Sequence, residues 1–352
     1  MDRREGVEHT SSSSLKGVLA AALTPMDGDL SPDHEAFVAH CHRLLDAGCH
    51  GLGVFGTTGE ANSLSVQARL AALEALVEGG VQGNSLLPGT GSCVLEDAAR
   101  LSRAALEAGS AGVLVLPPFY YKNVSDEGVF RFFADLIERI GDRRLRVYLY
   151  HFPQMTGVGF GLPLIGRLLE VYPGVVAGMK DSAGDWERIE TVCREFPDFS
   201  VFAGTERYLL DTLQHGGAGC ISATVNVTSR LARRVYDSHA AGQDDEARKL
   251  QEHLTVLRTQ IEAFPLIPAL KRIMARLTEA DGWYNLRPPL VRLEDDQAAK
   301  LLARVPLGEL DPAGRPVHHD PRPPPAPRAD AGGRPLRQHG IQRPRHHGKR
   351  GG

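Results

Sequence analysis

Short apolar runs alternate along this chain with longer amphipathic segments, and this alternation limits the folds that it can adopt. The apolar runs are typical of buried strands, and we expect eight of them, at residues 18–23, 51–55, 85–88, 111–116, 146–150, 175–179, 200–203 and 218–222. Helical periodicity marks the segments between them, at 32–47, 66–78, 95–108, 129–140, 162–172, 186–196 and 208–215. Eight strands, each followed by a helix, predict an α/β fold of the (β/α)8 TIM-barrel type, with an open doubly wound sheet as the alternative.

After residue 229 the pattern is helical only, with helices expected at 231–241, 244–263 and 265–279. One of these is the eighth barrel helix, and the others form a C-terminal helical extension. We therefore place the barrel strands and the first seven helices in residues 15–228, and the last barrel helix with the extension in residues 229–310.

Both ends of the chain differ in composition from the part between them. Residues 1–14 are polar and predict a flexible N-terminus, while residues 311–352 are rich in Pro, Arg, Gly and His and predict a disordered tail. The tail has a surplus of positive charge, so the rest of the chain is acidic. No basic stripe indicates nucleic-acid binding. A metal-binding tail built on its His pairs is a weaker alternative, because a proline-broken segment lacks fixed ligand geometry.

Five scattered cysteines, an odd number without metal-ligand spacing, predict reduced thiols. No apolar stretch approaches the roughly 20 residues that cross a bilayer, and the N-terminal residues contain no hydrophobic signal core. The sequence therefore predicts a soluble cytoplasmic protein without a membrane partner.

The most informative single residue is Lys180, which closes the apolar run 175–179. An ammonium group that loses its hydration can give up its proton, and the free amine is a nucleophile that forms Schiff bases with carbonyl compounds. The alternative is a lysine at a strand end that is paired with a carboxylate, for example that of Asp181.

A glycine-rich loop follows the second expected strand. Gly56 and Gly59 allow a tight turn that exposes backbone amides, and Thr57 and Thr58 add two hydroxyl groups. Such donors suit a carboxylate, although an ordinary loop between strand and helix is the alternative. Glu60 ends the loop and is expected to cap or orient the helix that follows.

Two tyrosines end the fifth expected strand. Alternation places Tyr148 and Tyr150 on the same side, opposite to Leu149. A phenol at a strand end can transfer protons, although buried tyrosines more often serve in packing. His151 is a competing base, but it faces away from Tyr150.

Four motifs resemble those of a known family and occur in the same order along the chain. They are residues 56–60, the pair Tyr120 and Tyr121, residues 150–153 and residues 178–182. Over roughly residues 15–308 the chain resembles the dihydrodipicolinate synthase and N-acetylneuraminate lyase superfamily. That resemblance implies a (β/α)8 barrel with extra C-terminal helices that forms a Schiff base with pyruvate.

The resemblance also implies roles for matching residues. Lys180 resembles the lysine that condenses with a 2-keto acid, and Tyr150 the tyrosine that moves protons. Thr57 resembles the hydroxyl that links Tyr150 to Tyr121, which the family lends across a subunit interface of a homotetramer. Thr58, with the amides of the loop from Gly56 to Gly59, is similar to the part that grips the substrate carboxylate. Further positions match the family's pocket lining: Gly204, Ile221 and Ser222.

One position departs from the family's synthases. Where they hold an arginine that binds the carboxylate of aspartate semialdehyde, this chain has Met155, and a thioether cannot replace a bidentate guanidinium. The segment 180–185 is closer to relatives that act on hydroxy-oxoglutarate or keto-deoxy sugar acids. Glu206 and Arg207 are placed to meet the distal end of such a substrate, or else they form a solvated helix start.

We therefore predict a class I aldolase or lyase that joins pyruvate, or another 2-keto acid, to an aldehyde or cleaves the product. It needs no metal and no organic cofactor, because the protonated imine accepts the electrons. The alternatives are 4-hydroxy-tetrahydrodipicolinate synthase proper, a sugar-acid dehydratase that uses the same imine, and a non-catalytic keto-acid sensor.

Overall fold

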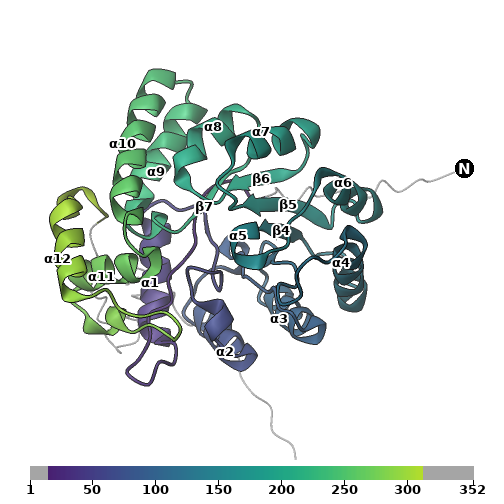
Figure 1. Ribbon diagram of the computed structural model, residues 1–352, viewed down its shortest axis with the longest axis horizontal. Coiled ribbons are helices and arrows are strands. Elements are labelled where there is room, and N and C mark those ends of the chain that lie inside the picture. Colours follow the sequence, from purple (N-terminus) through teal and green to yellow (C-terminus); the bar gives the residue numbers. More distant parts are fainter. Residues whose placement is uncertain (1–14, 312–352) are drawn as a thin grey trace, which may run out of the picture. The chain divides into compact units, whose positions relative to one another are not determined.

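The computed structural model describes residues 15–311, and within them seven strands form one parallel sheet (Figure 1). The strands are β1 (Gly17–Ala20), β2 (Gly51–Leu52), β3 (Val113–Val115), β4 (Val147–His151), β5 (Val176–Asp181), β6 (Ser200–Ala203) and β7 (Gly219–Ser222). Their order in the sheet is β2-β1-β7-β6-β5-β4-β3. Parallel strands bring their carboxyl ends to one edge of the sheet, so the loops that follow them gather there.

The strand expected at residues 85–88 is not formed as a strand. The chain there makes single parallel bridges, Leu52 to Leu86 and Gly89 to Leu114. Leu87 N donates to Leu52 O of β2 at 2.8 Å, and Leu114 N of β3 donates to Pro88 O at 2.8 Å. Proline has no N–H to donate, so one rung of the ladder is missing at Pro88. The segment 86–90 nevertheless joins the two edge strands by hydrogen bonds.

Helices lie around the outside of the strands in Figure 1. Those that precede β7 are α1 (His34–Asp46), α2 (Val66–Glu78), α3 (Leu95–Glu107), α4 (Asp126–Ile140), α5 (Pro153–Thr156), α6 (Leu162–Val171), α7 (Trp186–Glu195) and α8 (Leu209–Gln214). α4 shows why they form. The Ser125 hydroxyl caps the first turn by accepting from Gly128 N, and Val129, Phe133 and Leu136 repeat on one buried face.

The sheet is apolar on both faces, as parallel sheets usually are. Val18 and Val115 pack against the helices, whereas Leu19, Leu114 and Ile221, from alternate positions, pack with one another on the other face. Because both faces are buried, the strands read as continuous apolar runs, and this explains why most of them could be located from the sequence.

Up to residue 311, the last that the structure describes, four α-helices follow β7: α9 (Val225–Ala240), α10 (Asp244–Glu262), α11 (Leu266–Thr278) and α12 (Asp295–Arg304). The sequence predicted the first three but not α12. Leu257, Ile273 and Leu301 of the last three helices pack in a second core with Leu23 and Val227. Among residues 15–311 we find no helix with the length and apolarity that a membrane span requires.

Asp311 belongs to the fold, although the disordered tail was expected to begin there. Its backbone N donates to Val227 O at 2.9 Å, and its carboxylate accepts from Arg230 N at 3.3 Å. It thereby satisfies backbone groups of α9 beside the kink at Thr228. The flexible segment expected at 1–14 and the rest of the expected tail lie outside the described residues. All five cysteines are within them and carry free thiols, as predicted.

Gly89 provides a test of the segment that joins the two edge strands. A Cβ at this position would lie 2.3 Å from Phe55 O, a backbone atom that cannot move away freely. Gly89→Ala should therefore lower the free energy of unfolding by roughly 1–3 kcal/mol, measured by urea denaturation. Gly28→Ala, where a Cβ meets nothing within 4 Å, is the matched control. Equal stability of the two variants would contradict the close packing described here.

Candidate active site

Lys180 and Tyr150 lie side by side on neighbouring strands. Tyr150 of β4 is paired in register with Lys180 of β5. Both side chains are buried, and Lys180 Nζ lies 4.5 Å from the centre of the Tyr150 ring. The amine and the phenol thus reach the same space from adjacent strand ends.

Thr57 completes this cluster from the loop after β2. Its Oγ1 lies 3.2 Å from the Tyr150 hydroxyl, and either group can donate. Phe55 and Glu60, on either side of the loop, have positive φ angles of 55° and 57°, which few side chains adopt. The loop therefore has a specific backbone shape that presents Thr57 to the tyrosine.

Glu60 anchors this loop to the C-terminal helices. Its carboxylate is buried and lies 2.5 Å from Lys271 Nζ of α11, and it also accepts from Arg287 N at 2.8 Å. Burial lowers the pKa of Lys271, and the charge of Glu60 opposes that shift. Glu60 was expected to cap or orient the next helix. Instead, it joins the loop to a helix far along the chain.

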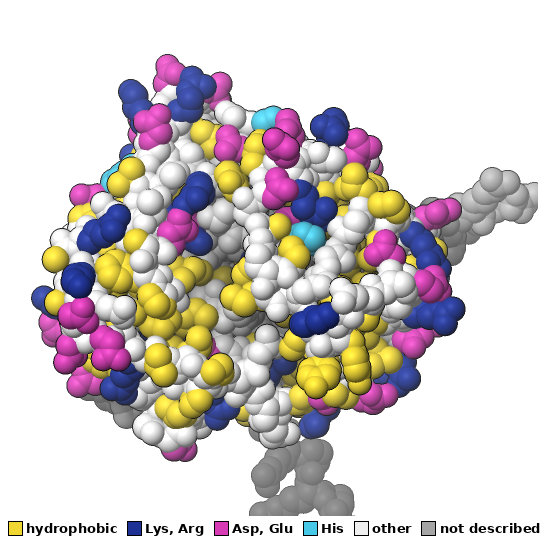
Figure 2. Space-filling model, viewed as in Figure 1, with side chains coloured by type: hydrophobic (Ala, Val, Ile, Leu, Met, Phe, Trp, Pro, Cys, Tyr) yellow, Lys and Arg dark blue, Asp and Glu magenta, His cyan; other side chains and the backbone are white. Residues whose placement is uncertain are grey.

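A cavity of about 600 Å³ opens over these residues. Figure 2 shows this face of the molecule hollowed near its centre, with side chains of both charges beside the hollow. The ends of β4 and β5 form one part of its wall, and the start of α11 with residues 289–294 forms another. The C-terminal helices are therefore part of the candidate site.

The structure brings six of the residues that the sequence placed at the site to this cavity: Lys180, Tyr150, Thr57, Thr58, Gly204 and Arg207. Gly204 has no room for a side chain, because a Cβ would lie 2.7 Å from Asp181 O. Gly59 is held in place by Thr24, whose Oγ1 donates a hydrogen bond to the Gly59 carbonyl at 2.9 Å. Gly56, like Gly59, belongs to the loop but is not among the residues that line the cavity.

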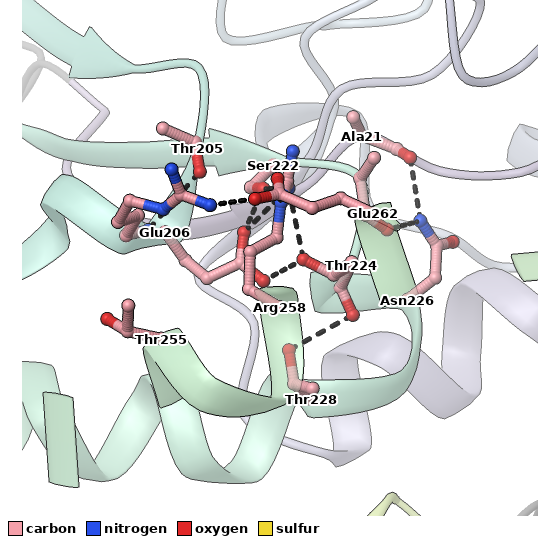
Figure 3. Close-up of polar contacts among 12 residues, drawn as sticks. Ala21, Thr205, Glu206, Ser222, Thr224, Asn226, Thr228, Thr255, Arg258 and Glu262 are labelled. Carbon is pink, nitrogen blue, oxygen red and sulfur yellow. Dashed lines mark hydrogen bonds and ion pairs between the residues drawn. The ribbon is translucent and has the colours of Figure 1, made fainter. Parts of the chain in front are cut away.

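Ile221, Ser222 and Glu206 were expected at the pocket and do not line it. Ile221 is fully buried within the sheet. Glu206 is also fully buried and accepts from the hydroxyls of Ser222 and Thr224 (Figure 3). Its carboxylate turns toward these donors because an unpaired charge at this depth would be costly. Glu206 is therefore neither a solvated helix start nor a group that faces the cavity.

Sequence reasoning missed Arg258 and Glu262 of α10, both of which line the cavity. Arg258 Nη1 donates to Glu206 at 3.1 Å, and its Nε donates to Glu262 at 2.8 Å (Figure 3). Arg207 also pairs with Glu262 and lines the cavity. One sequence signal could have found Arg258: it follows Leu254 by one helical turn, on the buried face of α10.

Tyr121 is exposed and does not line the cavity. Its side chain is 73% exposed, and its ring contacts that of Tyr120, which is 75% exposed, at 5.3 Å between centres. Within the described residues of one chain, Thr57 therefore has no contact with Tyr121. The predicted link between them requires a second copy of the chain.

The carboxylate expected as a partner for Lys180 lies elsewhere. Asp181 pairs with Arg188 at 2.8 Å, and its Oδ1 accepts from Ala183 N at 2.9 Å. Burial raises the pKa of Asp181, against the opposing effect of these donors. Lys180 forms no salt bridge to any residue between 15 and 311. In the same part of the chain, no group of three His, Cys, Asp or Glu side chains is arranged to hold a metal ion.

His151 points away from Tyr150, as alternation predicted. Its Nδ1 accepts from Phe160 N at 3.1 Å, and the ring does not line the cavity. Burial lowers the pKa of His151 to about 4, and the charge of Arg188 acts in the same direction. The imidazole is therefore neutral and structural.

Comparison with known proteins agrees with this arrangement. The Dihydrodipicolinate synthetase family model matches residues 14–306. The chain belongs to this family. It is 35% identical over 290 residues to a DapA-like lyase of Chloroflexus aurantiacus, covering 82% of this chain and 95% of that one. Proteins of the Dihydrodipicolinate synthetase family are lyases and aldolases, and this protein is an enzyme of that type.

Solved structures of the family have the same fold. A dihydrodipicolinate synthase from Agrobacterium tumefaciens is 33% identical with a TM-score of 0.74, and the match covers 82% of this chain and 97% of that one. YagE from E. coli K12, solved in complex with pyruvate, is 25% identical with a TM-score of 0.75, covering 82% and 96%.

The buried imidazole predicts a pH effect on stability. His151 binds its proton less readily in the folded chain than in the unfolded chain, whose ordinary pKa is 6.5. Stability is therefore lost as the pH falls from 6.5 toward 4, by up to about 1.4 kcal/mol per pH unit. His151→Asn keeps an acceptor for Phe160 N but does not titrate, so it should lose less stability than the wild type between pH 7.5 and pH 5, measured by urea denaturation.

His34→Asn is the control for this measurement, because His34 is an exposed residue of α1. It should follow the wild type at both pH values. A His151→Asn variant with the same pH dependence as the wild type would show that His151 is protonated in the folded chain.

Proposed function

We propose that this enzyme is a class I aldolase that forms a Schiff base between Lys180 and pyruvate or another 2-keto acid, and makes or cleaves a carbon–carbon bond to an aldehyde. The contact between Lys180, Tyr150 and Thr57 at the wall of one cavity is the observation that supports this most strongly. Schiff-base chemistry is general in the family, whose members use pyruvate and an aldehyde.

In this proposal, the free amine of Lys180 attacks the keto carbon, and the keto oxygen takes up a proton to give a carbinolamine. Loss of that oxygen as water leaves the protonated imine, which accepts the electron pair when a proton or an aldehyde leaves the adjacent carbon. Tyr150 carries the proton in this proposal, and the 4.5 Å between its ring centre and Lys180 Nζ supports that role. No metal or organic cofactor takes part in this sequence.

The loop after β2 holds the substrate carboxylate in this proposal. Thr58 lines the cavity beside Thr57, and the loop from Gly56 to Gly59 supplies backbone amides. Pyruvate would lie with its carboxylate on this loop and its keto carbon at Lys180, which leaves the rest of the cavity for the aldehyde.

The family resemblance supports three further parts of the proposal. The seven strands and segment 86–90 occupy the eight strand positions of a closed (β/α)8 barrel, and the helices after α9 are its C-terminal extension. The protein acts in the cytoplasm as a homotetramer. In that assembly, the exposed Tyr121 of each chain reaches Thr57 of a neighbour and completes the proton relay.

4-Hydroxy-tetrahydrodipicolinate synthase is the second candidate activity, supported by the 33% identity to the Agrobacterium enzyme. Against it stands Met155, which lines the cavity and is 63% exposed. A thioether offers no positive charge to the carboxylate of aspartate semialdehyde. We therefore place this activity below the aldolase, and slow turnover of aspartate semialdehyde compared with other aldehydes is the expected result.

Trapping with borohydride tests the imine. The wild-type protein incubated with pyruvate and sodium borohydride should gain a reduced pyruvyl adduct that peptide mass analysis locates on Lys180. Lys180→Ala should gain none, and Lys300→Ala, which removes an exposed lysine of α12, should react like the wild type. An adduct on another lysine, or none with any member of a panel of 2-keto acids, would contradict the proposal.

Substitutions at two adjacent tyrosines test the proton relay across subunits. Tyr121→Phe should lower kcat by about a hundredfold while the imine can still be trapped, because the variant lacks a proton donor but keeps Lys180. Tyr120→Phe removes the same atom from an equally exposed ring and should leave kcat close to that of the wild type. An unchanged kcat in Tyr121→Phe would remove this residue from the mechanism.

A further inference from the structure

Three charged side chains of the cavity wall, Arg207, Arg258 and Glu262, form a closed set with the fully buried Glu206, and we call these four residues the distal cluster. Arg258 bonds both carboxylates, at 3.1 Å to Glu206 and 2.8 Å to Glu262, and Arg207 also pairs with Glu262 (Figure 3). Two positive and two negative charges cancel. Arg292 and Glu294 also line the cavity and add one charge of each sign.

The distal cluster retains both N–H groups that can donate and carboxylate oxygens that can accept further hydrogen bonds. Arg258 uses Nε and Nη1 on its partners, and its Nη2 makes no hydrogen bond to a described residue. Arg207 Nε is buried and likewise has no partner among residues 15–311. Glu262 is 29% exposed at its side chain, so part of its carboxylate remains available as an acceptor.

A hydroxyl group fits these surroundings better than an anion does. A hydroxyl group both donates and accepts, so it can accept a hydrogen bond from a guanidinium N–H and donate one to a carboxylate. A phosphate or carboxylate only accepts, and in the cavity it would meet the charge of Glu262 without a net positive charge to offset its lost hydration. The cluster therefore favours an uncharged polar group.

We infer that the distal cluster selects an aldehyde whose far end is uncharged and hydroxylated, and that Glu262 sets this preference by neutralising Arg207 and Arg258. This inference rests on the proposed aldolase function, because it assigns the part of the cavity that pyruvate leaves free. Glu262 is the specificity-determining residue. Without the charge of Glu262, the cluster has a net positive charge and becomes an anion site, although Glu206 still pairs with Arg258.

The test compares two aldehydes that differ in one group at the far end, a hydroxyl in one and a phosphate in the other. Glyceraldehyde and glyceraldehyde 3-phosphate are each condensed with pyruvate, and the ratio of their kcat/KM values is measured. The wild type should favour glyceraldehyde by about tenfold or more, since placing like charges together is strongly unfavourable. Glu262→Gln should shift the ratio at least about tenfold toward the phosphorylated aldehyde.

Two further variants serve as an opposite charge change and as a control. Arg207→Met leaves the cluster with a net negative charge. Its ratio of kcat/KM values should therefore move the other way, toward glyceraldehyde. This variant replaces Glu262→Gln if that protein fails to fold. Glu252→Gln makes the same change at an exposed position of α10 and should keep the wild-type ratio.

Four outcomes would overturn the inference. They are a wild type that prefers the phosphorylated aldehyde, a Glu262→Gln variant with an unchanged ratio, an Arg207→Met variant whose ratio moves toward the phosphorylated aldehyde, and a wild type that traps pyruvate on Lys180 but condenses neither aldehyde. A wild type in which no imine can be trapped would overturn the proposed function, and this inference with it. Borohydride trapping on the same preparations therefore separates the two failures.

Discussion

The register between β4 and β5 is the constraint on which the candidate site depends. It pairs Tyr150 with Lys180, so a phenol and an amine emerge on the same face of the sheet at its carboxyl edge. A shift of one residue in either strand would turn its side chain to the opposite face. That register is held because both faces of the sheet are buried. Val147 packs toward the helices while Tyr148 packs toward the interior.

Buried charge pairs tie the strand-end loops to helices. Among residues 15–311 there are three at the carboxyl edge of the sheet: Glu60 with Lys271, Asp181 with Arg188, and Glu206 with Arg258. Such pairs add little net stability compared with apolar packing, but breaking one costs about 3–5 kcal/mol. Their effect is therefore positional. The first and third join loops of the sheet to α11 and α10, which brings the C-terminal helices into the wall of the cavity.

Much of this arrangement could be predicted because its signals are local. Lys180 stands out where an apolar strand ends in a charge, and Thr57 and Thr58 stand out within a glycine-rich loop. All three line the cavity. The strand expected at 85–88 was wrong for an equally local reason, since Pro88 cannot complete the ladder. Glu206 was placed at the cavity because its position after a strand was known, but its orientation was not.

The sequence by itself determined the alternation of strands and helices, and with it the residues that meet at the carboxyl edge of the sheet. Periodicity and strand ends are properties of neighbouring residues, so they can be read along the chain. Only the tertiary structure decided that Arg258 lines the cavity, that Lys271 pairs with Glu60, that Glu206 turns inward, and that Tyr121 remains exposed. These outcomes depend on which charges become buried together, and burial is decided by packing between segments far apart in the chain.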